Sequence, residues 1–121
     1  MKPLQIKDQK SIFDMLSLKG KVAFVTGAGG GIGRASAAAL ADVGANVALM
    51  DIPQKKDVLI ENCKAIEERY HVKAIPVVGN VADETDVIRM IDEVVKEFGR
   101  LDVVFSNAGI GGIQDNPREI A

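Results

Sequence analysis

The sequence contains few of the residues that build metal centres and disulfide frameworks. It has one cysteine, Cys63, and one histidine, His71. A single cysteine cannot form an internal disulfide, and the two residues together are too few for the usual cysteine-based or multi-histidine metal sites. We therefore expect no metal ligands. Tryptophan is absent and Tyr70 is the only tyrosine, so candidates for aromatic or phenolic chemistry are few.

Long apolar runs and an excess of positive charge are also absent. No run approaches the roughly 20 apolar residues that cross a bilayer. Lys and Arg number 15 against 17 Asp and Glu, a net charge of −2, which argues against nucleic acid or a membrane surface as partner. Because Asp8 and Asp14 interrupt the first twenty residues, we predict no secretory signal and a cytoplasmic protein.

What the sequence does contain is a regular alternation of apolar runs and helical patterns. Its 121 residues are 47% hydrophobic, which suits one globular domain over residues 21–121, preceded by a lead-in over residues 1–20 whose apolar residues we expect to dock on it. Strands are predicted at 22–25, 46–51, 73–78 and 102–106, and helices at 32–43, 54–70 and 83–98. Strands that are apolar throughout are buried on both faces. The order predicts an α/β fold, a Rossmann-like doubly wound parallel sheet with helices on both faces.

The most informative segment is the glycine-rich stretch from Thr26 to Gly33 (TGAGGGIG), which joins the first strand to the first long helix. Glycines let the backbone approach a ligand, and the free N–H groups of the following helix attract a pyrophosphate. The register fits neither a Walker loop nor GxGxxG. It fits Thr-Gly-x-x-x-Gly-x-Gly. The alternative to a ligand-binding loop is a tight turn that only allows close helix–strand packing. The strand before the stretch and the helix after it make this alternative the weaker interpretation.

Asp51 gives an independent indication of the same function. It ends the second predicted strand and follows Gly33 by 18 residues. An acid about 20 residues after such a loop binds the adenosine ribose hydroxyls in dinucleotide folds. Its charge would repel a 2′-phosphate, and Gly30 offers no cation to pair with one, so we predict NAD, with NADP less favoured. The alternative role for Asp51 is a turn or helix-cap acid next to Pro53.

Together these residues resemble the short-chain dehydrogenase/reductase family. Leu18 to Val22 (LKGKV) resembles the family's lead into its first strand, and Asn80-Val81 stands where the family usually has Asp-Val. Asn107-Ala108-Gly109 matches its Asn-Ala-Gly motif after the fourth strand. The resemblance covers almost all of 18–112. It implies an NAD(P)-dependent oxidoreductase that transfers a hydride between nicotinamide and an alcohol or carbonyl group.

The resemblance also implies roles for individual residues. The pyrophosphate would lie against the glycine-rich loop, at Gly27, Gly30, Gly31, Ile32 and Gly33. Asp51 and Ile52 would flank the adenosine, and Asn80 with Val81 would contact adenine, the Asn80 amide oxygen accepting from its amino group. The nicotinamide-side ribose would lie along Asn107, Ala108 and Gly109.

The family's catalytic residues have no counterparts here. The family uses a Ser, a Tyr-x-x-x-Lys pair and a helix Asn, normally downstream of Asn-Ala-Gly. Tyr70 has Ala74 at i+4 and Lys73 at i+3, so we interpret Tyr70 as the last apolar turn of a helix. We predict no catalytic residue in this chain. It would be a cofactor-binding half, truncated before the catalytic residues and inactive alone. The alternatives are a non-catalytic NAD-binding module and an inactive fragment.

Several properties of a whole enzyme follow only from the resemblance. The substrate would be a small-molecule alcohol or ketone. Sugar alcohols, ketoacyl thioesters, steroids and small ketones stay open, with a polyol or sugar favoured. The family commonly forms homotetramers, so a homo-oligomer is expected.

Overall fold

The computed structural model describes residue 6 and residues 9–107 of the chain. Its elements alternate as the sequence predicts. The helices are α1 (Ile12–Leu16), α2 (Gly31–Asp42), α3 (Lys56–Tyr70), which follows the 3₁₀ turn η2 (Pro53–Lys55), and α4 (Glu84–Phe98). The strands are β1 (Val22–Thr26), β2 (Asn46–Asp51), β3 (Ala74–Val78) and β4 (Val103–Phe105).

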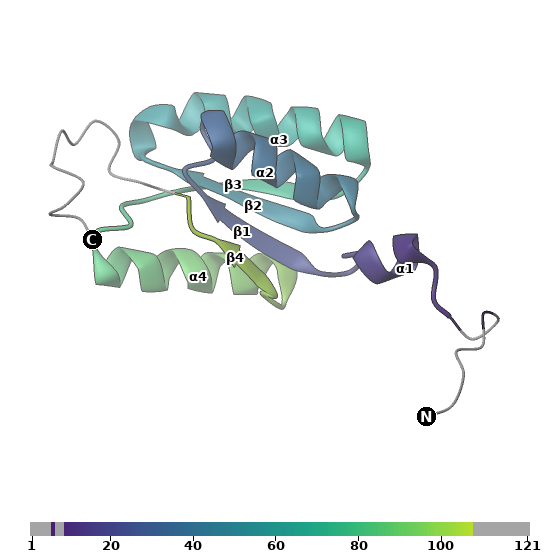
Figure 1. Ribbon diagram of the computed structural model, residues 1–121. Helices are drawn as coiled ribbons and strands as arrows, with labels where there is room; N and C mark the ends of the chain where they lie inside the picture. Colours follow the sequence, from purple (N-terminus) through teal and green to yellow (C-terminus); the bar gives the residue numbers. More distant parts are fainter. Residues whose placement is uncertain (1–5, 7–8, 108–121) are drawn as a thin grey trace, which may run out of the picture.

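The four strands form one parallel sheet in the order β3-β2-β1-β4. Helices α2 and α3 cover one face of it and α4 covers the other (Figure 1). The chain therefore winds outward from β1 in both directions, and the predicted Rossmann-like doubly wound fold is confirmed. In such sheets ligands bind beyond the carboxyl ends of the strands, where the winding direction changes between β1 and β4.

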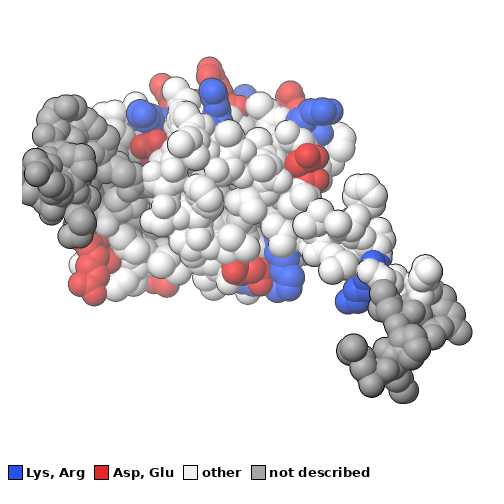
Figure 2. Space-filling view, viewed as in Figure 1, with Lys and Arg blue, Asp and Glu red and all other residues white. Residues whose placement is uncertain are grey.

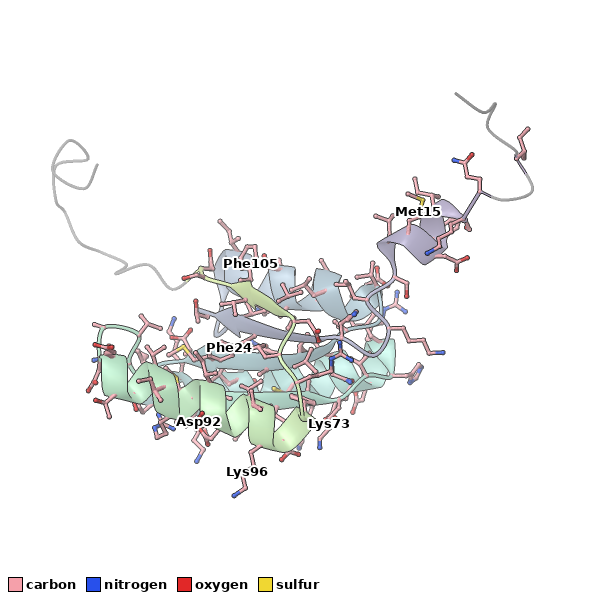
Figure 3. All side chains as sticks on the ribbon, turned by 90° about the horizontal axis from the view of Figure 1, so that it is seen from below. Met15, Phe24, Lys73, Asp92, Lys96 and Phe105 are labelled. Carbon is pink, nitrogen blue, oxygen red and sulfur yellow. The ribbon has the colours of Figure 1, made fainter. Side chains whose placement is uncertain are left out.

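The core consists of two apolar layers separated by the sheet. Successive β1 residues point to opposite faces. Ala23 and Val25 pack under α2 and α3, while Val22 and Phe24 pack against α4. Figure 3 shows Phe24 on the side of the sheet that α4 covers. All five β1 residues are buried, which explains why the strand is apolar without alternation.

Pro76 lies in the middle of β3, where it pairs with Leu49 of β2. A proline lacks the N–H of a sheet ladder. It is tolerated here because β3 is the edge strand of the described sheet, and Pro76 itself is exposed.

Two apolar segments differ from the sequence prediction. In the segment that forms α4, helical spacing predicts one apolar stripe made of Val87, Ile88, Ile91, Val94, Val95 and Phe98. The helix instead buries Met90 and Val94, whereas Ile88 and Val95 are exposed. It therefore contacts the sheet through a narrower face than this stripe implies. In the lead-in, Leu18 packs against the core, but α1 buries none of its residues and lies apart from the sheet (Figures 1 and 3). Among the described residues of the lead-in, Leu18 is the apolar side chain that docks on the core.

Candidate functional site

The glycine-rich loop runs from the end of β1 to the start of α2, at the carboxyl edge of the sheet. Gly27 and Gly31 have φ angles of 67° and 58°, a left-handed conformation that side chains disfavour. The Ala28 N–H donates to the Met50 carbonyl at 2.9 Å and holds the loop against β2. Helix α2 begins after Gly30 without a side-chain cap. Its first N–H groups have no intrahelical acceptors, so they remain available to an anion.

Gly33 allows α2 to pack directly on this loop. A Cβ atom at Gly33 would lie 2.1 Å from the Gly27 carbonyl oxygen and 3.0 Å from Asn107 Nδ2. No side chain fits in that space. The same contact brings the Asn107 amide beside the loop, so the first and fourth strands contribute to one site.

The Asp51 carboxylate is fixed to the loop by backbone hydrogen bonds. Its Oδ2 accepts from the Gly29 N–H at 2.8 Å and its Oδ1 accepts from the Ile52 N–H at 2.8 Å. Each carboxylate oxygen keeps a second lone pair for a further donor. The structure therefore brings Asp51 and the glycine-rich loop together, as the dinucleotide hypothesis requires.

The segment after β3 forms a turn that leads into α4. The Asn80 N–H donates to Asp86 at 2.6 Å, and Asn80 Oδ1 accepts from the Ala82 N–H at 2.9 Å. The bond from Asn80, with a second from Arg89, holds the pKa of Asp86 below its usual range. The Asn80 oxygen thus has a local partner, and its predicted bond to adenine would use the remaining lone pair. That bond stays a prediction.

Three apolar side chains of the site remain in contact with solvent. Ile32 is 71% exposed, Ile52 is 45% exposed and Val81 is 39% exposed. They follow β1, β2 and β3 respectively, at the same edge of the sheet. Exposed apolar side chains beside free N–H groups suit a ligand with both planar rings and phosphates.

Thr26 connects the ends of β1 and β4. Its hydroxyl accepts from the Asn107 N–H at 2.9 Å and donates to the Phe105 carbonyl at 3.5 Å. Thr26 is buried. This connecting role is not evident from the motif alone; the signal for it in the sequence is a hydroxyl at the end of an otherwise apolar strand. Ala108 and Gly109, the other residues of the Asn-Ala-Gly motif, lie outside the described residues.

Tyr70 lies at the opposite, amino-terminal edge of the sheet. It is the last residue of α3, packs partly against the core and has the Arg69 guanidinium 5.8 Å from its ring centre. Lys73 forms an ion pair with Glu97 of α4. Neither residue faces the glycine-rich loop, in agreement with the interpretation of Tyr70 as a packing residue. A groove of about 270 Å³ between α2 and α3 includes Tyr70 and contains no residue of the loop or Asp51.

The remaining surface has no concentration of one charge in the view shown. Lys and Arg side chains are interspersed there with Asp and Glu (Figure 2). Among residues 6 and 9–107, no group of three His, Cys, Asp or Glu side chains is placed to hold a metal ion. Within the same residues, no helix has both the length and the apolar character to cross a membrane.

The fold and the loop define an α/β protein of the Rossmann-like class. The family model for short chain dehydrogenases matches residues 21–120. The chain belongs to the short-chain dehydrogenase family, and the predicted resemblance is confirmed.

Individual relatives agree with this assignment. A sorbose reductase of Candida albicans is 44% identical over 100 residues, which cover 83% of this chain and 34% of the relative. Among solved structures, the NADPH-dependent 3-quinuclidinone reductase of Rhodotorula rubra has a TM-score of 0.73 and 36% identity, covering 98% of this chain and 43% of that one. An NAD⁺-bound xylitol dehydrogenase has a TM-score of 0.71 and 40% identity, covering 84% and 39%. The chain thus spans less than half the length of these relatives.

Proposed function

We propose that this chain is the nucleotide-binding part of an NAD-dependent oxidoreductase that transfers a hydride between nicotinamide and an alcohol or carbonyl substrate. The observation that carries the proposal is the bond from Gly29 N–H to Asp51 Oδ2 at 2.8 Å. It joins the phosphate-binding type of loop to the acid that would bind the adenosine ribose.

The residues present fit a dinucleotide. Its pyrophosphate would lie at the amino terminus of α2, over Gly27, Gly30, Gly31, Ile32 and Gly33, because that helix end carries free N–H groups. Asp51 and Ile52 would flank the adenosine and Val81 would contact adenine, while Asn107 with Ala108 and Gly109 would bind the nicotinamide-side ribose. The bound nicotinamide would supply the hydride chemistry.

Asp51 supports NAD as the cofactor because its charge would repel a 2′-phosphate. The relatives do not decide this point, since one solved structure holds NAD⁺ and another reductase is NADPH-dependent. A substitution of Asp51 can decide it.

We further propose that these 121 residues lack proton-transfer chemistry of their own. The single tyrosine ends α3, at the edge of the sheet away from the loop. The alternative function, a non-catalytic NAD-binding module or an inactive fragment, rests on that placement. A polyol or ketose substrate is supported by the similarity to a sorbose reductase and a xylitol dehydrogenase. Homo-oligomerisation, as a tetramer, remains a proposal from the family, and a cytoplasmic location remains a proposal from the sequence.

The substitution Asp51→Ala tests the cofactor assignment. We expect the preference of the chain for NAD over NADP, measured by calorimetric titration, to fall, because the repulsion of the 2′-phosphate is removed. Asp42→Ala removes an equivalent charge at the far end of α2 and serves as the control. An unchanged preference in Asp51→Ala would exclude Asp51 from this role. Failure of the unmodified chain to bind either dinucleotide would refute the proposed function.

A further inference from the structure

Lys55 lies close to Asp51 because of the short turn that follows β2. After Ile52, the residues Pro53–Lys55 form the 3₁₀ turn η2, closed by a bond from the Lys55 N–H to the Ile52 carbonyl at 2.9 Å. Proline at the start of this turn fixes its first φ angle. The turn directs the chain back toward the glycine-rich loop before α3 begins.

The space beside Gly29 shows where the Lys55 side chain lies. A Cβ atom at Gly29 would be 2.6 Å from Asp51 Oδ2 and 2.9 Å from Lys55 Cδ. Both side chains therefore occupy the volume next to Gly29 and lie side by side. The apolar stem of Lys55 rests on the loop, as long cationic side chains commonly do on apolar surface.

The ammonium group of Lys55 makes none of the ion pairs found in the described part of the chain. Gly30, the loop position expected to supply a cation in a protein selective for NADP, has no side chain and no atom within 4 Å of its would-be Cβ. Lys55 thus places a cationic side chain beside Asp51 from a different element, without forming an ion pair with it.

We propose that Lys55 is a cofactor-specificity residue that pairs with the 2′-phosphate of NADP and so opposes the selection for NAD by Asp51. This inference rests on the proposed dinucleotide function. A carboxylate alone beside a phosphate is strongly repulsive, whereas an adjacent ammonium supplies a charge-assisted bond. With both residues in place, the site still prefers the free adenosine ribose but also admits the phosphorylated one.

The test compares two ligands that differ only in this phosphate, ADP-ribose and ADP-ribose 2′-phosphate, by calorimetric titration of the full chain. Lys55→Met keeps the apolar stem over Gly29 and removes the charge. Lys56→Met removes the neighbouring charge, which is not among the nearest contacts of Gly29, and is the matched control.

We expect Lys55→Met to reduce the affinity for the phosphorylated ligand by about tenfold or more, because one charge-assisted hydrogen bond is lost. Its affinity for ADP-ribose should change by no more than about twofold, as for an exposed charge with no partner. The loss should persist in an Asp51→Asn background, where the phosphorylated ligand binds more tightly. Added salt should reduce the affinity for the phosphorylated ligand less in Lys55→Met than in the unmodified chain.

Two results would overturn the inference while leaving the proposed function intact. One is binding of ADP-ribose but not of its 2′-phosphate by the unmodified chain. The other is a Lys55→Met effect that is equal for both ligands or no larger than that of Lys56→Met. If the unmodified chain binds neither ligand, the dinucleotide function itself fails, and the role of Lys55 fails with it.

Discussion

Gly33→Ala is the most direct test of how α2 and the glycine-rich loop build the site. The added Cβ would lie 2.1 Å from the Gly27 carbonyl oxygen and 2.6 Å from its carbon. Both atoms belong to the backbone, so no side-chain rotation relieves the overlap. Either α2 or the loop must therefore shift.

The expected loss of stability follows from two opposing effects. Overpacking of a close contact costs about 1–3 kcal/mol, and a rigid backbone partner favours the upper end of that range. Alanine gains up to about 1 kcal/mol over glycine from helix propensity. The net effect is a decrease of about 2 kcal/mol in the free energy of unfolding, together with displacement of the α2 amino terminus from any bound phosphate.

Urea unfolding followed by circular dichroism measures this change. With an m-value of about 1–3 kcal/mol/M, the midpoint should fall by roughly 1 M. Gly30→Ala is the control, because no atom lies within 4 Å of its Cβ and its φ of −179° is extended. Equal midpoints for the two variants, with unchanged affinity for ADP-ribose, would refute the close packing of α2 on the loop.

Three further predictions concern single side chains outside the ligand contacts. Thr26→Val should lower the free energy of unfolding by about 1–3 kcal/mol, because the Asn107 N–H loses its acceptor. Thr26→Ser keeps a hydroxyl and should retain most of that stability in the same urea assay. Bonds from the Arg100 side chain and the Val22 N–H lower the pKa of Asp102 from 3.8 to about 2. The stability gained from this lowered pKa is present above pH 4 and should disappear as the pH falls from about 4 to 2. If Asp102→Asn lost stability over this pH range as steeply as the unmodified chain, the prediction would be contradicted. Burial, with a smaller contribution from Glu67, raises the pKa of Cys63 to about 12, so a thiol reagent should label this residue only after unfolding, and rapid labelling of the native chain would contradict its burial.

The sequence was sufficient for the architecture because each strand carries its own signal. Continuous apolar runs such as Val22–Val25 form where a parallel sheet is covered on both faces. Gly99 ends α4 with a left-handed φ of 78°, a typical helix end, directly after the predicted helix at 83–98. The burial of Met90 was missed because the apolar residues of α4 extend over more than one face, and only packing against Phe24, Met50 and Val77 selects the inner one.

The site was only partly predictable from the sequence. Features that lie close together along the chain were predictable, whereas contacts between distant positions were not. Glycine spacing and the position of Asp51 follow a periodic βαβ unit, so the sequence indicates them directly. The bonds from the Asn107 N–H to the Thr26 hydroxyl, and from the Val22 N–H to the Asp102 carboxylate, join residues about eighty positions apart. Such contacts depend on strand order, which no local pattern encodes.

Lys55 shows why local charge counts are insufficient for cofactor selectivity. The glycine-rich loop and Asp51 together contain one acid and no base, a charge balance that predicts NAD. The turn at Pro53–Lys55 changes that balance by placing an ammonium stem against Gly29, beside the carboxylate. Two backbone N–H groups hold the Asp51 oxygens in place beside the loop. In the proposed role, Lys55 offsets this negative charge when a 2′-phosphate binds, a competition that the affinities for ADP-ribose and its 2′-phosphate measure directly.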